Sequence, residues 1–86
     1  MVRVLIADSD KYLSATYCEE LLQCGFLVTT VTNGLECLEQ LRFLVPDVLV
    51  LEPGISWGGG DGVLALMHEC SDVPLVPVIV LTHGCP

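Results

Sequence analysis

Along the chain, short continuous apolar runs alternate with segments in which apolar residues recur every three or four positions. The runs predict strands and the recurring pattern predicts helices. Residues 2–7 (VRVLIA) form a short apolar run rich in β-branched side chains, which predicts a buried strand. From Lys11 to Cys24 the apolar residues recur every three or four positions, which predicts a helix that ends at Gly25. Residues 26–31 (FLVTTV) return to an apolar, β-branched composition and predict a second strand.

A second helix and a third strand follow. Asn33-Gly34 is a turn signal before helical spacing over residues 35–44. Pro46 ends that helix, because its ring disfavours α geometry in the residue before it. Residues 48–51 (VLVL) are uninterrupted apolar positions, too few for a buried helix and suited to a central parallel strand.

The last part of the chain predicts a loop, a third helix and a fourth strand. Residues 53–60 are rich in glycine, which permits backbone angles that other residues resist. Asp61 is the expected N-cap of a helix over about residues 62–70. Residues 76–81 (VPVIVL) predict the fourth strand, where Pro77 is tolerated near the strand start. This strict alternation predicts one α/β domain, a parallel sheet with helices on both faces.

Polar side chains follow three of the predicted strands. Asp8, Ser9 and Asp10 come after the first strand, Glu52 after the third, and Thr82 after the fourth. In open parallel sheets the ligand site lies at the carboxyl ends of the strands. We therefore expect these side chains to surround the functional site.

Four segments then carry a resemblance to a known family. Residues 4–11 (VLIADSDK) end in an acidic cluster, and residues 33–41 (NGLECLEQL) match an N-G-x-E-A-L segment. Residues 46–62 (PDVLVLEPGISWGGGDG) match P-D-x-x-x-x-D-x-x-M-P-x-x-D-G, and residues 77–83 (PVIVLTH) match a strand ending in Thr-Ala. Together they resemble the CheY-like receiver domain of bacterial two-component response regulators. The resemblance covers essentially the whole chain and implies a flavodoxin-like, three-layer α/β/α fold with its four strands in the order 2-1-3-4.

The resemblance also implies a chemistry. A receiver takes a phosphoryl group from a histidine kinase onto an aspartate after its third strand, with Mg²⁺ held there by that aspartate and by an acidic pair. A Thr or Ser after the fourth strand and a Lys after the fifth contact the phosphoryl group. In this sequence Glu52 takes the phospho-acceptor position, Asp8 and Ser9 take the acidic pair, and Thr82 takes the switch position.

Several of these positions depart from the family pattern. Glu52 holds its carboxylate about 1.5 Å beyond an aspartate, and a positional error near 1 Å already costs about 100-fold in rate. Ser9 offers a neutral hydroxyl, and Asp10, one residue further along, is expected to point elsewhere. The loop after Glu52 is longer than usual and carries Trp57, which could anchor a partner or fold back over the site.

These departures favour a degenerate pseudo-receiver that acts through phosphorylation-independent protein contacts. The alternative is an active receiver that accepts a phosphoryl group at Asp8, Asp10 or Glu52 unconventionally. Glu52 either imitates a phosphorylated aspartate or is a solvated carboxylate left after the chemistry was lost; a carboxylate carries one charge where phosphate carries nearly two, which favours the second. We expect no cofactor, since only Asp8 and Glu52 remain as hard ligands for Mg²⁺. An enzyme is the weakest interpretation, because no nucleophile and base pair is visible.

Composition excludes other classes of function. The apolar runs are far shorter than the roughly 18 residues needed for a membrane span, and Asp8 comes too early for a signal peptide, so we expect a cytoplasmic protein. A net charge of −8 with three basic residues argues against direct nucleic-acid binding. The five cysteines are odd in number and lack C-x-x-C spacing, so we expect free, mostly buried thiols.

The sequence ends at Pro86, before a fifth strand and its helix, so we expect a truncated domain over residues 1–86 whose fourth strand is an apolar edge. Two explanations stay open: the residues are an excerpt from a longer protein, or another chain completes the fold. We predict a symmetric homodimer joined near the fourth strand. A histidine kinase and an output domain are the other partners that the resemblance implies.

Overall fold

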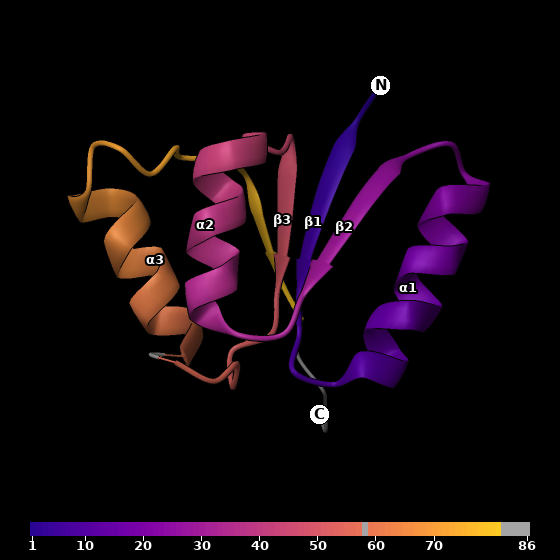
Figure 1. Cartoon of the computed structure of the whole chain (residues 1–86), viewed down its shortest axis with the longest axis horizontal. Helices are drawn as coiled ribbons and strands as arrows, with labels where there is room; N and C mark the ends of the chain where they lie inside the picture. The colour runs from indigo at the N-terminus through magenta and orange to yellow at the C-terminus, as the bar shows by residue number, and fades with distance from the viewer. Residues whose placement is uncertain (58, 82–86) are drawn as a thin grey trace.

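A computed structural model describes residues 1–57 and 59–81 and shows a three-layer arrangement (Figure 1). Helices α2 and α3 lie on one side of the sheet and α1 lies on the other. The four strands are all parallel, in the order β2-β1-β3-β4. The elements are β1 (Arg3–Ala7), α1 (Lys11–Gln23), β2 (Leu27–Val31), α2 (Gly34–Leu44), β3 (Val48–Leu51), α3 (Gly59–Glu69) and β4 (Val78–Val80). The predicted fold class and strand order are confirmed.

The main core lies between the sheet and the α2–α3 layer. Alternate residues of the two central strands point into it, with Leu5 paired to Leu49 and Ala7 paired to Leu51. Ile6 lies between them in sequence and faces the α1 side, where it is also fully buried. Both faces of β1 are therefore covered, as expected for the central strand of a parallel sheet. The members of the main core are Leu5, Ala7, Val31, Cys37, Leu38, Leu41, Leu49, Leu51, Ile55, Val63, Met67 and Val73.

Helix α1 is closed by a cap at each end. The Asp10 side chain accepts hydrogen bonds from the backbone N–H groups of Tyr12 and Leu13, which would otherwise lack partners. At the other end Gly25 has a φ of 92°, and its N–H donates to the Leu22 carbonyl at 3.0 Å. The next N–H reaches back to the Leu21 carbonyl at 3.1 Å, which completes a Schellman motif. The predicted stop at Gly25 is confirmed.

Residues 33 and 34 begin α2 directly and do not form the predicted turn before it. Asn33 is the N-cap: its Oδ1 accepts from the Glu36 N–H at 2.8 Å, and its Nδ2 donates to Glu36 Oε1 at 2.8 Å. This reciprocal pairing makes Gly34 the first residue of the helix and not part of a turn. Pro46 ends the helix as predicted, because Val45 before it leaves the right-handed region, with a φ of 46°.

Helix α3 begins earlier than predicted, and Asp61 is not its N-cap. The helix starts at Gly59, which places Asp61 in the first turn. The Gly60 N–H donates to the Pro53 carbonyl at 2.9 Å, so the loop that precedes the helix closes onto its first turn. A Cβ at Gly60 would lie 3.0 Å from the Pro53 Cα, a contact that only glycine avoids. Loop closure through glycine therefore sets the start of α3, which the capping preference of Asp61 could not reveal.

Strand β4 is shorter than the predicted run over residues 76–81. Pro77 has no N–H to donate, although its carbonyl accepts from the Leu49 N–H at 2.9 Å, so regular pairing begins at Val78. The predicted switch residue Thr82 lies outside the described residues. In the described part of the chain, no helix has the length and apolar composition to cross a membrane.

Candidate functional site

The carboxyl ends of β1 and β3 bring Asp8, Ser9 and Glu52 together. The two strands are in register up to Ala7 and Leu51, and the Glu52 N–H donates to the Ala7 carbonyl at 2.9 Å. The residues that directly follow the strands are therefore neighbours at one edge of the sheet, where open α/β sheets bind ligands. Both strands are held by buried neighbours, so the position of these side chains is set by the core.

Asp8 is the buried member of this site. The residue has no exposed surface, and its N–H extends the β2 ladder by donating to the Val31 carbonyl at 3.1 Å. Its Oδ1 accepts from the Asp10 N–H at 2.9 Å, while its Oδ2 is buried and has no hydrogen-bond partner among the described residues. A buried carboxylate oxygen without a donor or cation is unfavourable. Asp8 Oδ2 therefore lowers the stability of the folded chain at the centre of the site.

Ser9, which is exposed, and Glu52, which is half-buried, form the accessible part of the site. The Ser9 hydroxyl donates to Glu52 Oε1 over 3.3 Å, a long and weak hydrogen bond. The other carboxylate oxygen, Oε2, lies over Gly54, where an added Cβ would stand only 2.9 Å from it. The Glu52 carboxylate thus rests between Ser9 and Gly54.

Asp10 is held by the helix that follows it. One of its carboxylate oxygens accepts from the Tyr12 N–H at 2.9 Å and from the Leu13 N–H at 3.1 Å. Helix N-caps of this kind stabilise a protein by about 1 kcal/mol. Moving this carboxylate into the site would expose both N–H groups, so Asp10 does not replace the acid that Ser9 lacks.

Trp57 lies on the loop after Glu52, next to the start of α2. The loop is tied there by the Gly34 N–H, which donates to the Ser56 carbonyl at 2.8 Å, and by a bridge between Asn33 and Ser56. Trp57 has a φ of 64°, and its indole is half exposed beside Gly34. Its side chain thus lies near the first residue of α2 and stays half exposed to solvent.

Curated proteins and solved structures both support the family resemblance. No family model matches the chain. The transcriptional regulator NtrC of Escherichia coli is 34% identical over 79 residues, which are 92% of this chain and 16% of NtrC. The probable transcriptional regulator ycf27 of Guillardia theta is 29% identical over 79 residues, which are 31% of that protein. The chain therefore spans only a small part of these curated relatives.

Solved structures match almost the whole chain. The N-terminal domain of a response regulator receiver protein from Methanoculleus marisnigri superposes with a TM-score of 0.91 at 24% identity, covering 98% of this chain and 68% of that one. Chemotaxis protein CheY4 of Vibrio cholerae superposes with a TM-score of 0.87 at 21% identity, covering all of this chain and 72% of that one. This chain has the receiver fold. The resemblance predicted from the sequence is thus confirmed, and the residues at the strand ends can be compared with those of a receiver.

A magnesium ion, which the receiver fold implies, has few ligands in this chain. Where the structure describes the chain, no three His, Cys, Asp or Glu side chains are grouped to hold a metal ion. Asp10 caps α1 and Ser9 carries no charge, so Asp8 and Glu52 are the hard oxygen donors that remain. The chain thus offers one carboxylate fewer than the three of the receiver pattern, and no step of the pseudo-receiver function proposed below depends on a metal ion.

Two glycines of this receiver fold position the site without taking part in chemistry, and sequence reasoning missed both. Gly54 leaves room for the Glu52 carboxylate, and Gly34 lets the Trp57 carbonyl approach the α2 N-terminus, where a Cβ would collide with it. Gly34 was expected in a turn and Gly54 in a glycine-rich loop, so residue type alone did not indicate these contacts. Only the close approach between the two loops reveals their role.

Proposed function

We propose that this chain is a pseudo-receiver: a signalling module of the two-component type that acts through protein contacts without accepting a phosphoryl group. The observation that carries the proposal is the pairing of Ser9 with Glu52 at the ends of β1 and β3. These are the positions where a receiver needs a metal-binding acid and an aspartate acceptor. A hydroxyl and a longer carboxylate occupy them here.

The chemistry of these substitutions supports the proposal. Phosphoryl transfer depends on positioning and on a cation that neutralises the developing charge. Glu52 displaces the acceptor oxygen from the aspartate position, and Ser9 removes one negative ligand of the cation. With Asp10 committed to the α1 cap, neither loss is compensated by a neighbouring side chain.

An active receiver with an atypical acceptor is the second candidate, and one observation favours it. Asp8 is fully buried and its Oδ2 has no hydrogen-bond partner among the described residues. A cation bound beside Asp8 would give its Oδ2 a partner and would attract an anionic phosphoryl donor. In this case Glu52 or Asp8 would accept the phosphoryl group.

Acetyl phosphate with Mg²⁺, followed by intact mass, separates the two candidates. We expect no added phosphoryl group on the wild-type chain. The double variant Ser9→Asp, Glu52→Asp restores the aspartates of the family pattern and serves as the positive control, in which a phosphoryl adduct is expected. A wild-type adduct at the level of the double variant would reject the pseudo-receiver in favour of the active receiver.

The proposal includes protein partners in the cytoplasm, namely a histidine kinase or an output domain. A scarcity of basic residues, three in the whole chain, disfavours nucleic acid as a partner. The cysteines that the structure describes, Cys18, Cys24, Cys37 and Cys70, are free thiols, which suits a reducing compartment. Cys24 is exposed, whereas a buried thiol was expected, because it caps α1 and lies past the packed face of the helix.

A symmetric homodimer near the fourth strand remains part of the proposal. Strand β4 is at one edge of the described sheet, and Ile79 and Val80 there are 55% and 46% exposed. Apolar side chains at a free edge favour pairing with a second copy. Light scattering after size exclusion should give a dimer mass for the wild type and a monomer mass for Val80→Lys; a wild-type monomer at tens of micromolar would contradict the dimer.

A further inference from the structure

The opposite edge of the sheet, strand β2, presents a row of free backbone groups. The Leu27 N–H donates to the Val2 carbonyl at 2.9 Å, and the Val31 carbonyl accepts from Asp8 at 3.1 Å, so both of these β2 residues direct their backbone toward β1. In a parallel ladder alternate residues face alternate sides. Val28, Thr30 and Thr32 therefore point their N–H and carbonyl groups away from the sheet, where β2 has no neighbour among the described strands.

This edge lacks the features that usually prevent strand addition. Natural edge strands are protected by proline, by charged side chains, by bulges or by short length. Strand β2 (Leu27–Val31, LVTTV) has five residues in unbroken register with β1 and contains neither proline nor charge. Valine and threonine also have high β-propensity.

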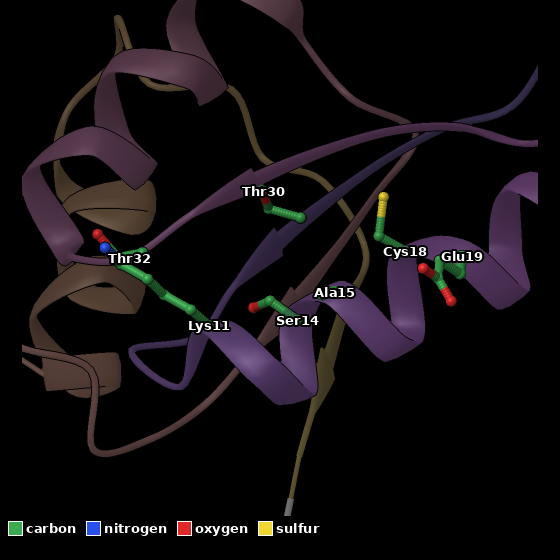
Figure 2. Close-up of a pocket in the computed structure, with 7 residues that line it drawn as sticks. All are labelled: Lys11, Ser14, Ala15, Cys18, Glu19, Thr30 and Thr32. Carbon is green, nitrogen blue, oxygen red and sulfur yellow. The ribbon is translucent and has the colours of Figure 1, made fainter.

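A groove runs between α1 and this edge (Figure 2). Its volume is about 490 Å³, and the helix side is built from the small side chains of Ser14, Ala15 and Cys18. Thr30 borders it from the strand side. The Ser14 hydroxyl is buried and has no hydrogen-bond partner in the described part of the chain. The groove thus offers room for side chains of an added strand beside the free backbone of β2.

The two ends of the groove carry opposite charges. The Lys11 side chain runs toward Thr32 at the carboxyl end of β2, and Glu19 borders the groove further along α1 (Figure 2). Eight residues of helix separate the two charges along the axis by about 12 Å. Neither side chain forms an ion pair with another described residue. A strand lying along β2 therefore meets a cation at one end and an anion at the other.

We infer that β2 and the α1 groove bind an extended segment of a partner protein as an added strand beside β2. The segment has a basic residue at the end next to Glu19 and an acidic residue at the end next to Lys11. Backbone hydrogen bonds to Val28, Thr30 and Thr32 supply affinity, and the charge order fixes the direction. This inference rests on the proposed function, since it names the surface through which the pseudo-receiver meets a partner.

Two capped peptides of equal length test the surface. Acetyl-KVTVTVE-amide carries both inferred charges and acetyl-QVTVTVQ-amide carries neither. In titrations of the isotope-labelled chain followed by NMR, the first peptide should shift the amide signals of Val28, Thr30 and Thr32 saturably. Because two exposed charge pairs are involved, it should bind about fivefold tighter than the uncharged peptide.

Charge variants provide the matched controls. Lys11→Glu and Glu19→Lys should each make the two peptides bind about equally, because in either variant one end of the charged peptide is attracted and the other end is repelled. Thr30→Pro should abolish binding of both peptides without unfolding the chain, because that N–H points away from β1. Far-ultraviolet circular dichroism checks the fold of each variant.

Three outcomes would overturn the inference: no saturable shift at the three amides up to millimolar peptide, shifts centred on β4, or a peptide preference that Lys11→Glu leaves unchanged. All measurements use the unphosphorylated chain. A phosphoryl adduct on the wild type would therefore reject the pseudo-receiver without affecting these titrations, and absent peptide binding would reject the β2 surface without affecting the phosphorylation result.

Discussion

The Ser9 hydroxyl donates to Glu52 Oε1 at 3.3 Å and so joins the end of β1 to the end of β3. Asp8 lies directly before Ser9, fully buried. The site thus holds two carboxylates and one neutral hydroxyl. This arrangement limits the negative charge that the sheet edge must bear in the absence of a cation.

Ser9→Asp should make the stability of the chain depend on a divalent cation. A third carboxylate beside Asp8 and Glu52 adds like-charge repulsion, so the free energy of unfolding should fall by about 1 kcal/mol without metal. Millimolar Mg²⁺ should restore it in the variant and leave the wild type nearly unchanged, because binding to the folded state stabilises it. Thermal unfolding with EDTA or Mg²⁺ measures both; a wild-type melting temperature that rises as much as the variant's would contradict the prediction.

Asp8→Asn should stabilise the chain. The amide keeps the oxygen that accepts from the Asp10 N–H and removes a buried charge without a counter-ion. We expect the free energy of unfolding to rise by about 1 kcal/mol in urea titrations at neutral pH. Asp8→Ala is the control, since it removes the charge and the hydrogen bond together and leaves a cavity; it should be less stable than Asp8→Asn.

Gly34→Ala should destabilise the chain while Gly62→Ala should stabilise it. A Cβ at Gly34 collides with the Trp57 carbonyl, so one of the two loops must move, at a cost of about 2 kcal/mol. A Cβ at Gly62 meets nothing within 4 Å, and alanine in a helix is favoured over glycine by about 1 kcal/mol. Urea denaturation of both variants gives the comparison, and equal effects of the two substitutions would refute the Gly34 contact.

Val45→Gly should raise the stability, although glycine usually lowers it. Val45 has a φ of 46°, where a β-branched side chain is strained by roughly 1–2 kcal/mol. Glycine removes that strain at the end of α2 and loses part of the gain to the entropy of the unfolded chain, so we expect a net increase of about 0.5–1 kcal/mol. Leu44→Gly, one residue earlier and within the helix, should instead lower the stability.

The Cys37 thiol should remain protonated in the folded chain over the whole neutral range. Burial raises the pKa of Cys37 from 9.0 to about 12. In the unfolded chain this thiol ionises near pH 9, so its contribution to stability is complete below pH 9 and is lost as the pH rises toward 12. Unfolding of Cys37→Ala should show a smaller loss of stability over that range. In mass spectrometry after brief alkylation at pH 8, the exposed Cys24 should react before Cys37.

Strand and helix order could be predicted from the sequence because hydrophobic spacing records which residues are buried. The run VLVL at β3 and the stop at Gly25 each reflect a local physical constraint that needs no knowledge of the partner element. The start of α3 could not be predicted in this way. It depends on the contact between Gly60 and Pro53, which is made only after the loop has folded.

The candidate site was predictable in position but not in its contacts. Parallel topology requires Asp8 and Glu52 to be neighbours, because the ends of adjacent strands coincide. Whether the Asp10 carboxylate joins them depends on a competition with the α1 N-terminus, which the helix wins. The place of Trp57 depends on Gly34, a residue 23 positions earlier in the chain, which local sequence patterns do not connect.

The contact between Trp57 and the start of α2 has an optical consequence. Trp57 is the only tryptophan in the chain, and its half-exposed indole lies on the loop that follows Glu52. Its fluorescence therefore reports on this one loop, against a background of two tyrosines. Any ligand or partner that rearranges the carboxyl ends of β1 and β3 changes the solvent around the indole and shifts its emission, so the chain carries its own label beside the site.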